Sequence, residues 1–159
     1  MSGVNYFLKL DGIDGESKDV KHKNELQIES WSFGTLHYRD PLGGRSKTSL
    51  SEINFTMRLD KASTKLMLAC GSGQKIATAI LTCHKAGGDN AGEEYLTVTL
   101  TEVFIASVSI SSAKGGGDPT PFVSFSLVSK TIKVEYKTQT QKGSLSGSVG
   151  YQHTVGTGT

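Results

Sequence analysis

The chain has 159 residues, the size of one domain that is large enough to bury a hydrophobic core. Its 17 Lys and Arg against 15 Asp and Glu give a net charge of +2, so it lacks the basic surface that binds the phosphates of nucleic acid. A hydrophobic fraction of 36% excludes a disordered chain. No apolar run approaches the roughly 18 residues that span a bilayer, so we expect neither a nucleic-acid partner nor membrane insertion.

The N-terminus, MSGVNYFLKLDG, has no basic segment followed by an apolar stretch. It predicts a protein that is made in the cytosol without a cleavable signal peptide. Cys70 and Cys83 therefore begin reduced, and their spacing matches no CxxC or zinc motif. We expect both thiols to be small, buried, unreactive apolar groups.

Alternation of apolar and polar residues, typical of strands with one buried face, dominates the chain. It predicts strands at 4–10, 25–34 and 53–59. Apolar parity changes within the second run, which indicates a bulge or a strand that passes between two packed sheets. Residues 35–51, with Pro41 and the Gly43-Gly44 pair, are predicted to form a loop longer than most loops in compact domains.

One helix is predicted, at about 62–71, with Ser63 as its cap and Gly71 and Gly73 at its end. The run 76–83 that follows is apolar enough for a strand buried on both faces.

The last third of the chain predicts further strands. Residues 94–113 reverse their apolar parity twice, which indicates two strands or one sharply bent strand. Residues 122–129 and 131–137 are expected to form a final pair of strands, with Ile132, Val134 and Tyr136 facing inward.

These elements predict an all-β protein with one short helix, either a small antiparallel barrel or a sandwich. Residues 1–137 make the β domain, and 138–159 form a Gly/Ser/Thr-rich C-terminal segment. Within that segment Val149 and Tyr151 fit a short strand, and the rest is expected to be mobile until a neighbour orders it.

A search for catalytic or metal-binding patterns finds none that holds. His22, His37, His84 and His153 form no pair with metal-ligand spacing, and we expect each to be a solvated surface residue. The string GSLSG at 143–147 has leucine where a nucleophile elbow needs serine. We therefore predict no catalytic residue, no metal, no cofactor and no enzymatic activity.

Five strings resemble the haemolysin-coregulated protein (Hcp) family, the tube subunit of bacterial type VI secretion systems. They are GESKD at 15–19 followed by His22, ESWSFG at 29–34, LDKASTKLMLACGSG at 59–73, HKAGG at 84–88 with EYL at 94–96, and VFIASVS at 103–109. They occur in the family's order and span most of residues 6–136. Two departures are Thr64, where many relatives have proline, and a C-terminus without the family's tryptophan-bearing closing segment.

The resemblance implies a ring-forming barrel. Six copies would close into a homo-hexamer, and the rings would stack into a hollow tube inside a contractile sheath, behind a spike protein of the VgrG type. The tube would be exported from the bacterial cytoplasm through the type VI apparatus, and its lumen would hold and stabilise effector proteins.

Side-chain alternation assigns opposite faces to neighbouring residues in ESWSFG. We expect Trp31 and Phe33 to pack into the domain or a ring interface, because large aromatic residues are poorly suited to line a water-filled channel. Ser30 and Ser32 then take the wetter face, which the resemblance makes the lumen, so both are candidate cargo-facing residues.

The loop at 35–51 is predicted to serve assembly, since a protruding arm can reach the next subunit of a ring without blocking closure. Its candidate contact residues are apolar anchors and cations: Leu36, Tyr38, Leu42, Arg39, Arg45 and Lys47. The alternative is a monomeric β-sandwich that binds a sugar or a peptide with this loop. Size in solution separates the two hypotheses.

Overall fold

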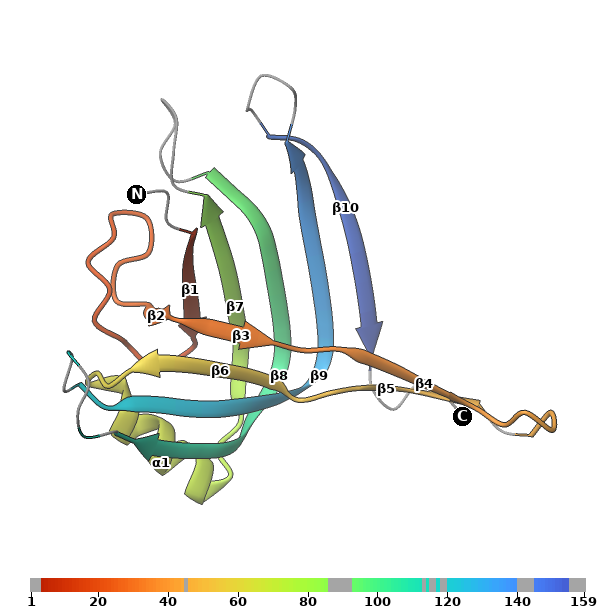
Figure 1. The fold of residues 1–159 in the computed structure, drawn as a ribbon, viewed down its shortest axis with the longest axis horizontal. Coiled ribbons are helices and arrows are strands. Elements are labelled where there is room, and N and C mark those ends of the chain that lie inside the picture. The colour runs from red at the N-terminus through yellow and green to blue at the C-terminus, as the bar shows by residue number, and fades with distance from the viewer. Residues whose placement is uncertain are drawn as a thin grey trace.

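The computed structural model describes residues 4–44, 46–85, 93–112, 114, 117, 120–139 and 145–154, and over these the chain forms ten strands and one helix (Figure 1). In chain order the elements are β1 (Val4–Leu10), β2 (Leu26–Ile28), β3 (Ser30–Ser32), β4 (Thr35–Arg39), β5 (Ser46–Leu50), β6 (Ile53–Arg58), α1 (Ala62–Ser72), β7 (Ile76–Lys85), β8 (Glu93–Ser111), β9 (Phe122–Gln139) and β10 (Leu145–Thr154).

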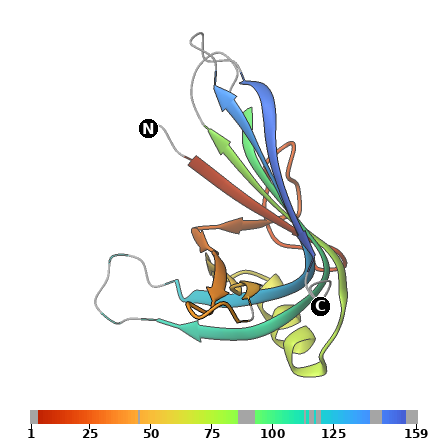
Figure 2. The ribbon, with the colours of Figure 1, turned by 90° about the vertical axis from the view of Figure 1, so that its right-hand side faces the viewer.

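Eight of the strands form one sheet with antiparallel neighbours, in the order β2-β1-β7-β8-β9-β6-β3, and β10 pairs with β9 outside this path. In Figure 1 the upper half of the sheet contains β1, β7 and β10, while the lower half contains β3 and β6. The long strands β8 and β9 turn sharply and run through both halves (Figure 2). Since β2 and β3 follow each other in the chain and lie at the two ends of the order, the sheet nearly closes. The predicted small antiparallel barrel with one short helix is confirmed.

The step from β2 to β3 explains why the apolar residues of 25–34 change parity. Strand β2 pairs with β1 and β3 pairs with β6, so the two strands join the two ends of the sheet. Between them, the Glu29 N–H donates to the carbonyl oxygen of Thr56 at 2.8 Å. Leu26 and Ile28 are buried on one side of this step, and Trp31 packs against the core on the other.

The bend in β8 lies at Glu102, whose φ of 51° is left-handed. Buried residues alternate on one parity before this residue and on the other after it: Val98 and Leu100, then Val103 and Ile105. The carboxylate of Glu102 lies 3.1 Å from Lys75 Nζ and 3.6 Å from Lys130 Nζ. Hydrogen bonding to Lys75 and the charge of Lys130 lower the pKa of this exposed carboxyl.

A bulge farther along β8 explains the second parity reversal. The register with β9 shifts between Ile105 and Ser107, so Ala106 is the extra residue. The segment is thus one bent strand, the second of the two alternatives that its pattern left open.

Helix α1 covers the predicted range of about 62–71, but the side chain that accepts a main-chain N–H at its start is Asp60 and not Ser63. The Asp60 Oδ1 atom accepts the Ala62 N–H at 2.6 Å, and Ser63 Oγ accepts the Asp60 N–H at 3.2 Å. Gly73, with φ 67°, ends the helix in the left-handed conformation, as predicted. At 11 residues, α1 is too short to cross a membrane, and no other helix occurs among the described residues.

The C-terminal third corrects two predictions. Residues 122–139 form one continuous strand, β9, not a pair of strands, and Tyr136 is exposed while Ile132 is buried and Val134 half-buried. Residues 145–154 form β10, which pairs with β9 and is longer than the short strand predicted around Val149 and Tyr151. Main-chain hydrogen bonds hold a strand whatever its side chains, so a Gly- and Ser-rich sequence indicated only part of it.

Candidate functional site

Uncharged polar side chains cover one side of the lower half of the barrel in two rows that cross four strands. Strand register aligns the first row as Ser32, Asn54, Ser126 and Ser107 and the second as Ser30, Thr56, Ser124 and Ser109. We call these eight residues the serine face. Hydroxyl groups bond within it, between Ser30 and Thr56 and, at 2.7 Å, between Ser107 and Ser126. Its exposed hydroxyl and amide groups can form hydrogen bonds with water or polar groups, and none of its eight side chains is charged.

The opposite side of the same strands is apolar and faces the core. In register, Trp31 lies opposite Phe55, Phe55 opposite Phe125, and Phe125 opposite Val108. Phe55 and Phe125 are almost fully buried, and their rings stack with centroids 5.1 Å apart. This layer fixes the strands so that their alternate residues form the serine face.

The aromatic residues of ESWSFG lie as predicted. Trp31 is half-buried, its ring 6.1 Å from Tyr6 in an edge-on contact and 5.8 Å from Phe33 in a stack. Ser30 and Ser32, on the other face of β3, are exposed. The prediction that the aromatics pack and the serines face solvent is confirmed, and the cargo-facing role of the serines stays a prediction.

Within residues 35–51, β4 and β5 form a β-hairpin where a loop was predicted. Strands β4 and β5 pair from Thr35 opposite Leu50 to Arg39 opposite Ser46, and they form a sheet separate from the barrel. Figure 1 shows this hairpin, which we call the arm, extending away from the barrel. Nine of its ten strand residues are exposed, and Leu50 alone is intermediate.

The arm carries its apolar side chains into solvent. Leu36 is 68% exposed, Tyr38 64% and Leu42, in the turn, 93%. Leu36 and Tyr38 project on one face of β4, because alternate strand residues share a face. A face of this kind, without a core of its own, is typical of a surface that another chain covers.

The charged residues predicted for the arm are distributed along it. Arg39 and Lys47 are exposed on β4 and β5, and Lys47 lies directly opposite Tyr38. Arg45 lies outside the described residues. The turn before it contains Gly43 with φ 83°, whose N–H donates to the Asp40 carbonyl at 3.1 Å.

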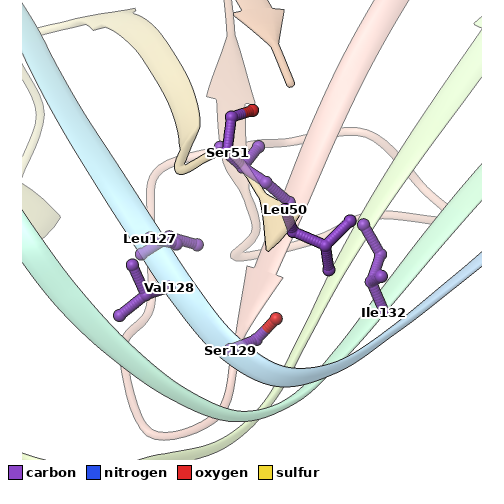
Figure 3. Close-up of a pocket in the computed structure, with 7 residues that line it drawn as sticks. Leu50, Ser51, Leu127, Val128, Ser129 and Ile132 are labelled. Atoms are coloured by element: carbon purple, nitrogen blue, oxygen red, sulfur yellow. The ribbon is translucent and has the colours of Figure 1, made fainter. Parts of the chain in front are cut away.

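A small apolar cavity lies where the arm meets the barrel (Figure 3). Leu50 and Ile132 point toward one another across it, and Ile53 and Leu127 add to its lining. Its volume is about 160 Å³, less than the roughly 300 Å³ at which small-molecule pockets usually begin. The cavity fits one apolar side chain better than a sugar.

Known proteins are similar to this chain in sequence and in fold. The family model described as "Type VI secretion system effector, Hcp" matches residues 7–136. The chain belongs to the Hcp family. It is 36% identical over 148 residues to protein hcp1 of Pseudomonas aeruginosa, with 91% of this chain and 90% of that protein aligned.

Solved structures extend the similarity to the whole Hcp fold. The crystal structure of Hcp1 from Salmonella typhimurium has a TM-score of 0.76 and 34% identity, and the match covers 95% of this chain and 94% of that one. A structure described as a type six secretion system protein has a TM-score of 0.85 at 27% identity, with 96% of each chain covered. The resemblance carried by the five strings is thereby confirmed, and the chain is a tube protein of type VI secretion.

The two cysteines of this Hcp chain differ in burial. Cys83 is fully buried, and desolvation raises the pKa of its thiol to about 12, against the opposing effect of hydrogen bonds with Trp31 and Tyr95. Cys70, near the end of α1, is half-buried and free. The prediction of two buried thiols is right for Cys83 and wrong for Cys70.

The burial of two histidines, His22 and His84, was not predicted from their spacing in the sequence. His37 is exposed on the arm, as predicted, with Nδ1 2.8 Å from Thr48 Oγ1. His22 and His84 are buried, not solvated, and their Nε2 atoms lie 2.6 Å apart. They are separated by 62 positions in the chain, so no local motif signals the contact.

Proposed function

We propose that this chain is the repeating subunit of the type VI inner tube: six copies close into a ring, and the rings stack into a tube that is exported. The observation that carries this proposal is the arm, an ordered hairpin with exposed apolar side chains and no core of its own. In a cyclic ring one surface of each subunit meets a different surface of the next. A projecting arm supplies such a surface without blocking closure.

The arm offers both kinds of contact that a subunit interface uses. Leu36, Tyr38 and Leu42 provide apolar area, and Arg39 and Lys47 provide cations for carboxylates of the adjacent subunit or ring. The cavity at the base of the arm is sized for one side chain from a neighbour. These features support assembly as the role of the arm.

The serine face is our candidate for the wall of the lumen. Its two rows are polar, and six of its eight residues are exposed in the single chain, whereas the other side of the same strands is core. A channel that holds water and protein cargo needs a wall that stays hydrated. This supports cargo-facing roles for Ser30 and Ser32.

The remaining partners follow from family membership. We infer a contractile sheath around the tube, a spike protein of the VgrG type at its tip and effectors within it. We also infer export through the type VI apparatus. The role is structural, in keeping with a family of structural secretion proteins.

The decisive experiment measures mass in solution. The parent chain should run as a ring of about six times its 16.9 kDa subunit mass by light scattering. Replacing residues 38–47 with a short Gly-Ser turn should leave the barrel folded by circular dichroism, because surface hairpins contribute little to loop-closure entropy. Tube formation, followed by electron microscopy, should be lost.

A matched control removes an exposed apolar side chain elsewhere. Val20, 96% exposed and outside the arm, is changed to serine and should leave ring and tube unchanged. A monomeric parent chain would favour the sugar- or peptide-binding alternative. An arm deletion that still forms tubes would return the arm to the status of a surface hairpin.

The lumen assignment has its own test. Ser32→Gln adds bulk to the serine face without charge and should alter effector retention in co-purification while the ring mass stays that of the parent. Loss of folding would show instead that position 32 belongs to the core, and unchanged retention of every effector would remove it from the cargo surface.

A further inference from the structure

A cluster outside the arm and the serine face joins two buried histidines. His22 lies in the connection between β1 and β2, and His84 lies near the end of β7; they are 6% and 3% exposed. Their rings meet almost at right angles, with Nε2 atoms 2.6 Å apart. Phe7 stacks on His22 at 4.7 Å and meets His84 edge-on at 5.5 Å, which shields the pair from one side.

A carboxylate completes the cluster from the next strand. Glu94 Oε1, on β8, lies 3.3 Å from His22 Nε2 and 3.5 Å from His84 Nε2. The Glu94 side chain is 40% exposed, so solvent reaches the cluster from its side. Burial and the neighbouring His22 lower the pKa of His84.

The three facing atoms have the spacing of a metal site. In a tetrahedral zinc site with bonds of about 2.0 to 2.1 Å, neighbouring ligand atoms are about 3.3 Å apart. Both distances to Glu94 match this value, and the two rings need to separate by only about 0.7 Å from 2.6 Å. We propose that His22, His84 and Glu94 bind one divalent transition-metal ion, with zinc as the best-matched ion for this donor set.

The atoms around His22 orient it as a metal ligand. Its Nδ1 atom lies 2.8 Å from Glu25 Oε2, where an Nδ1–H donates to the carboxylate. This bond leaves the lone pair on Nε2, the atom that faces His84 and Glu94. A carboxylate that holds the far nitrogen of a ligating histidine is a recurrent feature of zinc sites.

The connection between β1 and β2, which carries His22, is held by hydrogen bonds to its main-chain N–H groups and by a close approach at Gly15. Asp19 Oδ1 accepts the N–H groups of Lys21 and His22, at 2.9 and 3.2 Å. A Cβ atom on Gly15 would lie 2.6 Å from the Glu25 carbonyl oxygen, so only glycine permits the approach that places Glu25. These contacts hold His22 and Glu25 in place before any ion binds.

An ion at this position would connect three segments of the chain. It would join the β1–β2 connection to β7 and β8, and its fourth coordination position would remain open to water from the Glu94 side. Three protein ligands and a bound water describe the coordination, and the ion's effect would be to stabilise this end of the barrel.

The test uses the full chain without a polyhistidine tag. After chelator treatment and dialysis, zinc chloride should bind at one ion per subunit by elemental analysis and calorimetry. At a hundredfold excess over Kd the melting temperature should rise by about 5 °C or more. His22→Gln and His84→Gln should each abolish stoichiometric binding, and Glu25→Gln should weaken it about 10-fold to 100-fold.

Glu94→Gln decides the question if the buried histidine variants fail to fold, because Glu94 is partly exposed. It should fold as the parent does and bind zinc at least about tenfold more weakly. His37→Gln, on the arm, is the matched control and should keep one zinc per subunit. No binding by the parent, or unchanged binding by Glu94→Gln, would overturn the proposal and leave a hydrogen-bonded histidine pair. Stoichiometry is counted per subunit, so the outcome does not depend on ring formation.

Discussion

The lower half of the barrel and the arm both present polar side chains on paired strands, yet they differ in what lies behind those strands. Behind the serine face lies an aromatic layer with Phe55 and Phe125 at its centre. None of the strand residues of the arm is buried. The free energy of unfolding should therefore depend on residues of the barrel, and assembly on residues of the arm.

The largest expected effect contrasts two adjacent residues of β9. Phe125→Ala should lower the free energy of unfolding by about 3–5 kcal/mol, because it removes a buried ring and leaves a cavity. Ser124→Ala, on the serine face, should change it by less than about 0.5 kcal/mol. Urea unfolding followed by tryptophan fluorescence measures both, and equal effects would contradict the division between the two faces.

Alkaline pH should destabilise the barrel through the buried Cys83 and the half-buried Tyr95. Burial raises the pKa of Cys83 and of Tyr95 to about 12. Both groups lose protons first in the unfolded chain, so stability falls as pH rises from about 9 toward 12, by up to about 1.4 kcal/mol per pH unit for each proton. Urea unfolding at successive pH values should show a shallower fall in Cys83→Ala and in Tyr95→Phe. A slope identical to that of the parent in both variants would refute this cause.

The bend in β8 should show a smaller effect of backbone conformation. Glu102 has φ 51°, a region that glycine adopts freely and that β-branched residues adopt at a cost. Glu102→Val should therefore be about 1–2 kcal/mol less stable than Glu102→Gly. Both variants lose the contacts with Lys75 and Lys130, so chemical denaturation of this pair isolates the backbone. A valine variant as stable as the glycine variant would show that the bend does not depend on this conformation.

The smallest effect on folding belongs to the arm. Tyr38→Ser should change the free energy of unfolding by less than about 0.5 kcal/mol, because the side chain is already 64% exposed. Under the proposed function it should nevertheless weaken ring or tube formation, measured by light scattering across a concentration series. A stability loss comparable to that of Phe125→Ala would place Tyr38 within the fold of the single chain.

The sequence predicted best where strands have one buried face. Alternation located β1 and β6, and the parity reversals marked the step at Glu29 and the bend at Glu102. The arm was missed as a pair of strands because both of its faces are exposed, and β10 was predicted only as a short strand around Val149 and Tyr151. Their main-chain pairing leaves no periodic signal in composition.

Some features of the candidate sites could also be predicted from the sequence, and others could not. The exposure of Ser30 and Ser32 followed from alternation beside Trp31. The alignment of the serine rows across four strands depends on register, and the contact of His22 with His84 depends on packing between β1, β7 and the connection that follows β1. Local spacing carries neither piece of information.

Strands β8 and β9 are paired from Leu96 opposite Tyr136 to Ser111 opposite Phe122, through both halves of the barrel. Neither half can open without breaking hydrogen bonds of strands that the other half shares, so the barrel should unfold as one cooperative unit. The arm joins that unit only at its base. In native-state hydrogen exchange, the amides of β8 and β9 should report global unfolding, while those of β4 and β5 exchange through local opening in any subunit whose arm has no partner.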